Sequence, residues 1–182
     1  MFYGKGSYGN GAAMRVAPLG AFFCQDYELC AKEARLSAEV THSHPEGIAG
    51  AVAVAVAAAW MRRETDWNRE GFFATILEHT PSGQTRDGIE KASELDSDRD
   101  SYEAGQLLGN GRQISAQDTV PFCLWSAAVD PDNFEETFWR TILAGGDQDT
   151  TCAIACGVVA ARTAAPSAWV ERREELPTRA LS

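Results

Sequence analysis

Apolar residues recur along the chain at helical spacing and are separated by short polar breaks. The longest apolar stretch runs from Ile48 to Trp60 and consists mostly of alanine and valine. Because it is apolar on every side, it predicts a central buried helix that continues to Arg63, with small side chains that allow close helix packing. The stretch is 13 residues long, which is too short to span a bilayer.

The same periodicity predicts further helices on both sides of this segment. In segment 26–39, Leu29, Ala31, Ala34 and Leu36 can share one helix face. Segment 87–108 carries many charges, which indicates either a solvated helix face or a loop between two helices. Other helices are expected at 67–79, from 115 onward with Pro121 in the first turn, at 133–143 and at 152–161.

No segment alternates polar and apolar residues as a strand would, so the predicted fold class is all-α, a compact multi-helix bundle. There is no internal repeat and no linker that would separate two domains. We therefore expect one domain over residues 1–165, followed by a polar tail over 166–182.

Composition narrows the function classes. The 182 residues are 45 % apolar and 23 % charged, which is ordinary for a soluble domain. The formal charge of −10 argues against a nucleic-acid partner. The N-terminus has no apolar signal region, and five cysteines without a Cys-x-x-Cys pair suggest reduced thiols. We expect a cytoplasmic protein without a membrane partner.

A glycine-rich loop, Gly4 to Gly11, is the first candidate site. Glycines allow backbone N–H groups to approach a ligand closely, and Ser7 and Asn10 add polar contacts. The segment Ala12–Ala17 reads as the opening of a helix, which would place the loop at a helix N-terminus where anions are favoured. The alternative is a flexible tail.

The second candidate site follows two glycines, Gly145 and Gly146, near the C-terminal end. Asp147, Asp149 and Thr150 supply hard oxygen ligands of the kind that Mg²⁺, Mn²⁺ or Ca²⁺ prefers. They precede a buried helix, so Asp149 or Thr150 could instead be a simple N-cap.

Two histidines stand in the connector Thr41-His42-Ser43-His44-Pro45-Glu46-Gly47. Either could satisfy a loop or cap hydrogen bond, or could stand at a pocket rim beside a helix N-terminus. The sequence leaves both interpretations open for His42 and favours the structural one for His44, where Ser43 or His44 can cap the helix that Pro45 begins.

Taken together, three strings resemble the ADP-ribosylglycohydrolase family, which includes the dinitrogenase-reductase-activating glycohydrolases. They are residues 6–18, residues 41–47 and residues 145–150. The resemblance implies an all-helical fold with two Mg²⁺ or Mn²⁺ ions in a cleft. It also implies hydrolysis of the N- or O-glycosidic bond between ADP-ribose and a modified protein side chain or a small molecule.

The resemblance also implies roles for individual residues. Asp147 and Asp149 would be catalytic carboxylates that position the ions and assist proton transfer, and both would be metal ligands together with Thr150. The remaining implied residues would bind the substrate, with the loop lining the diphosphate and ribose pocket: Gly6, Ser7, Tyr8, Gly9, Asn10 and His42.

One departure from the family pattern is large. A Thr-Asp-Asp-Thr string and an upstream glutamate, which complete the dimetal site in the family, are not found in this sequence. We therefore expect a fragment, the C-terminal part of the family domain, with apolar surface around Ile48–Trp60 left exposed. Three hypotheses follow: an enzyme that needs an N-terminal complementing chain, a protein that binds ADP-ribose or a related nucleotide without hydrolysing it, or a helical structural protein.

Overall fold

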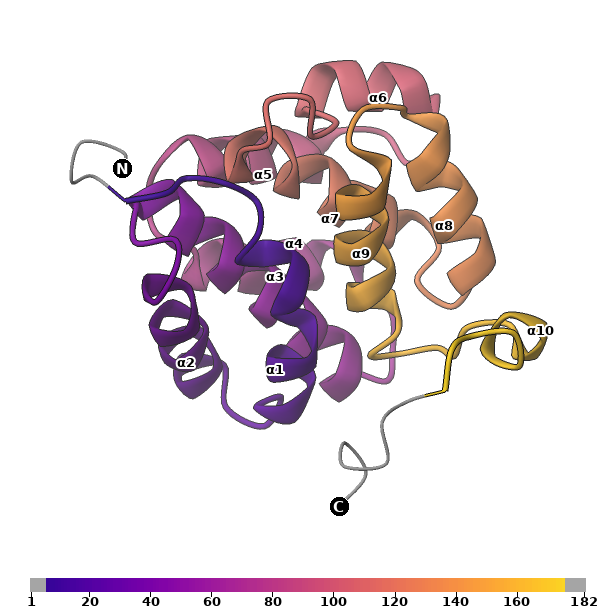
Figure 1. Cartoon of the computed structure of the whole chain (residues 1–182), viewed down its shortest axis with the longest axis horizontal. Coiled ribbons are helices and arrows are strands. Elements are labelled where there is room, and N and C mark those ends of the chain that lie inside the picture. The colour runs from indigo at the N-terminus through magenta and orange to yellow at the C-terminus, as the bar shows by residue number, and fades with distance from the viewer. Residues whose placement is uncertain (1–5, 176–182) are drawn as a thin grey trace.

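The predicted helices are present, and the computed structural model arranges them around α3 (Figure 1). The structure describes residues 6–175. In this range the α-helices are α1 (Ala17–Phe22), α2 (Tyr27–Glu39), α3 (Pro45–Arg63), α4 (Arg69–His79), α5 (Gln84–Glu94), α6 (Ser101–Leu108), α7 (Val120–Val129), α8 (Phe134–Leu143), α9 (Gln148–Val159) and α10 (Ser167–Val170). Two 3-10 turns, η2 (Ala13–Arg15) and η3 (Ala116–Asp118), complete the helical part.

Helix starts coincide with capping residues that the sequence displays. The Asp26 carboxylate accepts a hydrogen bond from the Leu29 N–H at 3.0 Å, and Asn68 and Asn133 act in the same way for α4 and α8. The charged segment 87–108 divides into α5 and α6 with a loop between them, which is the second of the two predicted arrangements. Within residues 6–175, β-type pairing is limited to one bridge between Gly9 and Ser115, so the all-α prediction is confirmed.

Helix α3 forms the core, as its apolar sequence predicts. Every residue from Gly47 to Met61 is buried, and α1, α2, α4 and α9 pack around it. The prediction that its apolar surface is exposed is therefore wrong, because the chain's own helices cover it. In the described part of the chain, no helix combines the length and apolarity that a membrane span requires.

Close helix packing changes which face of α2 is buried. The buried residues are Cys30, Ala34 and Ala38, whereas Leu29 and Leu36 are 37 % and 47 % exposed. The prediction that Leu29 and Leu36 lie on the buried face of α2 is therefore wrong. Small side chains let α2 approach α3 closely, so the leucines lie to the side of the contact.

The C-terminal part of the described chain is held by aromatic side chains. Trp169 of α10 packs edge-to-face against Phe138 of α8, with ring centroids 5.0 Å apart, and also contacts Phe134 and Trp139. Figure 1 shows α10 at the periphery beyond α8. The first residues of the predicted polar tail are thus packed, residues 176–182 lie outside the described range, and the domain boundary at residue 165 remains a prediction.

Candidate functional site

The described part of the glycine loop, residues 6–11, folds tightly against the connector that carries His42. Gly6 has φ +78°, and a Cβ added there would overlap Ser43. The Ser7 hydroxyl accepts a hydrogen bond from the Gly9 N–H at 3.2 Å. A Cβ at Gly11 would lie 3.0 Å from His42 Nε2, so this glycine permits the close approach of the ring. Gly4, the first predicted loop residue, lies outside the described residues.

The loop does not lead directly into an α-helix. It is followed by the single 3-10 turn η2, and the short helix α1 begins only at Ala17. The predicted helix opening over residues 12–17 is thus present as a 3-10 turn that leads into α1, and not as the first turn of an α-helix. The cause is Pro18, which occupies the first turn of α1 and fixes the helix start there.

The loop and the histidine together enclose a pocket of about 430 Å³. Of the predicted substrate-binding residues, Ser7, Tyr8, Gly9, Asn10 and His42 line it, and Gly6 does not. The structure adds two lining residues that the sequence did not reveal, Gln113 and Ile114.

Ile114 stands on a second loop, residues 109–119, which closes the pocket. The turn depends on Gly109 and Gly111, with φ values of +93° and +85°, and on two hydrogen bonds to Asp118: its carbonyl accepts from the Gly111 N–H and its carboxylate from the Gln113 N–H. Ile114 itself has φ +52°, a strained conformation for a β-branched residue. Its side chain is 65 % exposed at the pocket rim, so an apolar group stands at the entrance of the pocket. The Gly109-Asn110-Gly111 turn was the only signal of this loop in the sequence.

His42 faces the pocket through Nε2 and is held from behind by Nδ1. Nδ1 lies 2.8 Å from the Thr41 hydroxyl, which also accepts a hydrogen bond from the Arg15 guanidinium at 2.9 Å. Burial of the ring, together with the positive charge of Arg15, lowers the pKa of His42. His44 instead caps α3, since its Nδ1 accepts the Glu46 N–H at 3.2 Å. The structure thus places only His42 at the pocket.

The predicted carboxylates lie at the N-terminus of α9. Asp147 occupies the N-cap position but makes no cap hydrogen bond, and its Oδ2 accepts instead from Asn10 Nδ2 at 3.2 Å. Asp149 lies in the first turn, where the hydrogen bond with Asp147, followed by the Thr150 N–H, lowers the pKa of Asp149. The alternative that Asp149 or Thr150 caps the helix is therefore wrong. The structure brings Asp147 and Asp149 together and joins Asp147 to the glycine loop.

Oxygen atoms of Asp147, Asp149 and Thr150 are the donors that a hard divalent cation prefers. Mg²⁺ and Mn²⁺ accept about six oxygen ligands, several of which can be water. Within residues 6–175 no cluster of three or more His, Cys, Asp and Glu side chains is arranged to hold a metal ion. The residues present therefore fit one side of a cation site and do not complete its shell.

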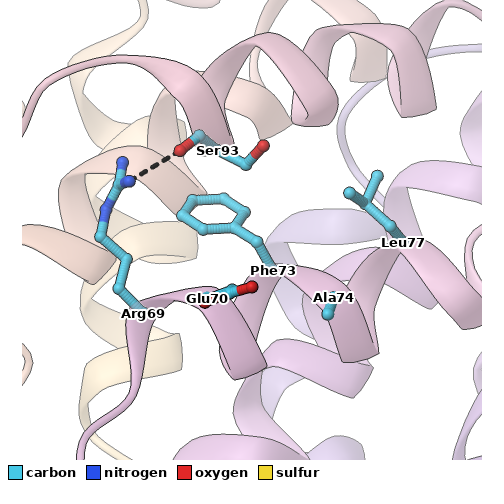
Figure 2. Close-up of a pocket in the computed structure, with 6 residues that line it drawn as sticks. All are labelled: Arg69, Glu70, Phe73, Ala74, Leu77 and Ser93. Atoms are coloured by element: carbon cyan, nitrogen blue, oxygen red, sulfur yellow. Dashed lines mark hydrogen bonds between the residues drawn. The ribbon is translucent and has the colours of Figure 1, made fainter.

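A second pocket, of about 440 Å³, lies between α4 and α5 and contains none of the predicted site residues (Figure 2). Its main polar group, Arg69, donates hydrogen bonds to the carbonyls of Ala92, Ser93 and Leu95 at the end of α5, while its guanidinium stacks on Phe73. These bonds satisfy carbonyls that have no partner within the helix. Arg69 therefore stabilises the C-terminal end of α5.

Comparison with known proteins agrees with the geometry. The model of the ADP-ribosylglycohydrolase family matches residues 2–181. The chain is 39 % identical over 165 residues to an uncharacterised protein of Archaeoglobus fulgidus, with 88 % of this chain and 52 % of the relative covered. It is 30 % identical to the ADP-ribosylhydrolase ARH3 of Homo sapiens over 209 residues (95 % of this chain, 56 % of the relative) and 30 % identical to that of Gallus gallus over 206 residues (95 % and 55 %).

These matches confirm the resemblance that the three sequence strings indicated. The fold is the all-α fold of that family, and the chain belongs to the ADP-ribosylglycohydrolases. It spans about half the length of the curated relatives that it matches.

Proposed function

We propose that the protein acts as a metal-dependent hydrolase that removes ADP-ribose from a modified protein side chain or a small molecule, by cleavage of an N- or O-glycosidic bond. The observation that carries the proposal is the hydrogen bond between Asn10 and Asp147, because it joins a nucleotide-sized pocket to a pair of adjacent carboxylates. Family membership supplies the chemical class.

The pocket would take the ADP end of the substrate. Backbone N–H groups of the glycine loop can approach a diphosphate closely, and neutral His42 can donate from Nε2 when Nδ1 accepts from Thr41. Tyr8 and Ile114 at the rim are 45 % and 65 % exposed and offer apolar contact to a flat ring. The geometry suits a ligand with a negatively charged centre and an aromatic end.

The carboxylates would serve the reacting end. Asp147, Asp149 and Thr150 would hold one side of the Mg²⁺ or Mn²⁺ ions, which when bound would orient ribose hydroxyls and activate a water. Cleavage at the ribose C1 develops positive charge on the sugar, and carboxylates nearby stabilise that charge. Asn10 keeps Asp147 fixed, so this carboxylate needs little reorganisation during the reaction.

The rest of the coordination shell would come from outside the described residues. The relatives are about twice as long as this chain. We propose that a complementing N-terminal segment, whether on the same polypeptide or on a partner chain, supplies the remaining acidic ligands.

The test is release of ADP-ribose from two defined peptides, one ADP-ribosylated on arginine and one on serine, with Mn²⁺ or with a chelator. The assay is run with this chain alone and with a candidate complementing segment that contains Thr-Asp-Asp-Thr. Metal-dependent release that is abolished by Asp149→Asn is the expected result. If no release occurs in either mixture, although ADP-ribose binds, the hydrolase proposal is contradicted for this chain.

A second candidate is binding of ADP-ribose or a related nucleotide without hydrolysis. It is favoured by one observation, that the described residues supply only two carboxylates at the site. Calorimetric titration of ADP-ribose with and without Mg²⁺, on the wild type and on Asp149→Ala, separates the two. Binding that is unaffected by both the metal and the substitution supports the second candidate.

A further inference from the structure

Asn10 is the most deeply buried polar residue in the described part of the glycine loop, residues 6–11. The residue is only 4 % exposed, although neighbouring Tyr8 is 45 % exposed. Its backbone carbonyl accepts the Met14 N–H at 3.1 Å, which fixes the residue against η2. Asn10 contributes to the lining of the pocket, but its side chain is almost wholly covered by its neighbours.

The amide group of Asn10 is committed to two partners. Nδ2 donates to Thr119 Oγ1 at 3.1 Å and to Asp147 Oδ2 at 3.2 Å. Thr119 Oγ1 donates its own hydrogen to the Ser115 carbonyl at 2.7 Å, so it can only accept from Asn10. Both partners are therefore acceptors, and the two hydrogens of one amide nitrogen satisfy them both.

These bonds connect three segments that are distant in the sequence. Ser115 forms a β-bridge with Gly9, and the Ala116 N–H donates to the Tyr8 carbonyl at 3.0 Å. Two neighbouring backbone contacts therefore join the loop 109–119 to the glycine loop. Thr119 and Ser115 are buried at 0 % and 1 % exposure. Asn10 therefore links the glycine loop directly to Asp147 by a hydrogen bond.

We infer that Asn10 is a positioning residue that couples occupancy of the glycine-loop pocket to the orientation of Asp147, and that it is not itself a ligand contact. The inference rests on the proposed function. A ligand in the pocket would stabilise the loop conformation in which Asn10 holds Asp147. Because coupling between two sites is reciprocal, metal at the carboxylates strengthens nucleotide binding by the same factor as nucleotide strengthens metal binding.

Two substitutions separate positioning from packing. Asn10→Ala removes the donors and leaves a small void, whereas Asn10→Leu removes the donors and keeps the volume. A packing role is restored by leucine, but a positioning role is lost in both. Asn68→Ala is the matched control, because Asn68 caps α4 away from the pocket and its loss affects stability alone.

The experiment measures the affinity of the whole chain for ADP-ribose by calorimetry with and without Mn²⁺, and its affinity for Mn²⁺ from the electron paramagnetic resonance signal of the free ion. In the wild type and in Asn68→Ala, we expect Mn²⁺ to tighten ADP-ribose binding by about fivefold or more, as is typical of coupled sites. In Asn10→Ala and Asn10→Leu, the ratio of the ADP-ribose affinity with Mn²⁺ to that without Mn²⁺ should fall to about one. The metal-free ADP-ribose affinity should stay within about threefold of the wild type, which is a smaller change than the loss of a direct polar contact would cause.

Four results overturn the inference, and they are distinguishable from one another. If both Asn10 variants keep the wild-type ratio, or the wild type binds ADP-ribose with no effect of Mn²⁺, the coupling is absent while the pocket stands. If metal-free binding falls strongly in both variants, Asn10 is a ligand contact. If the folded wild type binds neither Mn²⁺ nor ADP-ribose, the proposed function itself fails, and the inference fails with it.

Discussion

His42 is the residue whose protonation state depends most directly on its place in the site. Its pKa is lowered by burial and by the positive charge of Arg15, so the folded protein binds fewer protons here than the unfolded chain does. The contribution of His42 to the free energy of unfolding should therefore be fully present above the pKa of about 6.5 that histidine has in the unfolded chain. It should be lost as the pH falls toward the lower pKa that His42 has in the folded protein. Urea unfolding of the wild type and of His42→Asn between pH 5 and pH 8 checks this.

The free energy of unfolding of the wild type, minus that of His42→Asn, should increase as the pH rises through that window. The slope of this increase should correspond to less than one proton. A difference that stays constant from pH 5 to pH 8 would contradict the link between His42 protonation and folding. Arg15→Gln supplies an independent check. Removal of this charge should raise the His42 pKa in the folded protein and so narrow the pH range over which the stability changes.

Gly145 and Gly146 form a matched pair at the turn before Asp147. Both have positive φ, +69° and +77°, but an added Cβ is in open space at Gly145 and overlaps the Asn110 carbonyl at Gly146. Gly145→Ala should cost about 1–2 kcal/mol from the left-handed backbone alone. Gly146→Ala should cost about 2–4 kcal/mol, since overlap is added to the same strain. Chemical denaturation measures both costs.

Gly146→Ala should also weaken Mn²⁺ binding more than Gly145→Ala does, because the Asp147 N–H bonds to the Asn110 carbonyl that the new methyl group would displace. Equal losses of stability in the two variants would show that close contact at Gly146 has no energetic role.

The N-terminus of helix α5 is capped by a side chain of another helix. Its N-cap residue, Gly83, provides no side chain, and the Glu46 carboxylate of α3 accepts the Gln84 and Thr85 N–H groups at 2.9 and 2.8 Å and the Thr85 hydroxyl at 2.6 Å. Glu46→Ala should lower the free energy of unfolding by about 2–3 kcal/mol, because the N–H and the hydroxyl of buried Thr85 lose a charged partner.

Thr85→Val, which removes only the hydroxyl donor, should cost about 1 kcal/mol by the same measure. Urea denaturation followed by circular dichroism compares the two variants. The account of this cap is wrong if Glu46→Ala is no more destabilising than Thr85→Val.

The elements differ in how far the sequence could predict them. Helix α3 was predictable because an Ala-Val run is apolar all round, and α8 because Asn133 is a cap that acts locally. The carboxylates, the glycine loop and His42 could be named as candidates because each has a chemical signature of its own. Ile114, the bond between Asn10 and Asp147, and the cap by Glu46 could not be predicted, since each joins positions far apart in the chain, or depends on a backbone strain that only the tertiary structure imposes.

The described part of the molecule folds around one buried helix, α3. Since α3 is fully covered by helices of the same chain, we expect cooperative folding and a single thermal transition. A ligand that binds only the folded state at 100 times its Kd adds about 2.7 kcal/mol of stability. For a chain of 182 residues, that corresponds to an increase in Tm of about 5–10 °C.

We therefore predict that ADP-ribose with Mn²⁺, each at 100 times its measured Kd, raises the Tm of the chain by at least this amount, and that a chelator returns it to the value with ADP-ribose alone. Asp149→Ala should retain the shift from ADP-ribose and lose the additional shift from Mn²⁺, because Asp149 stands at the carboxylate pair and does not line the pocket. A metal effect that survives in Asp149→Ala would place the cation elsewhere on the protein. The predicted result, loss of the metal effect with the ADP-ribose effect kept, would show that the pocket and the carboxylates are two distinct sites on one folded unit.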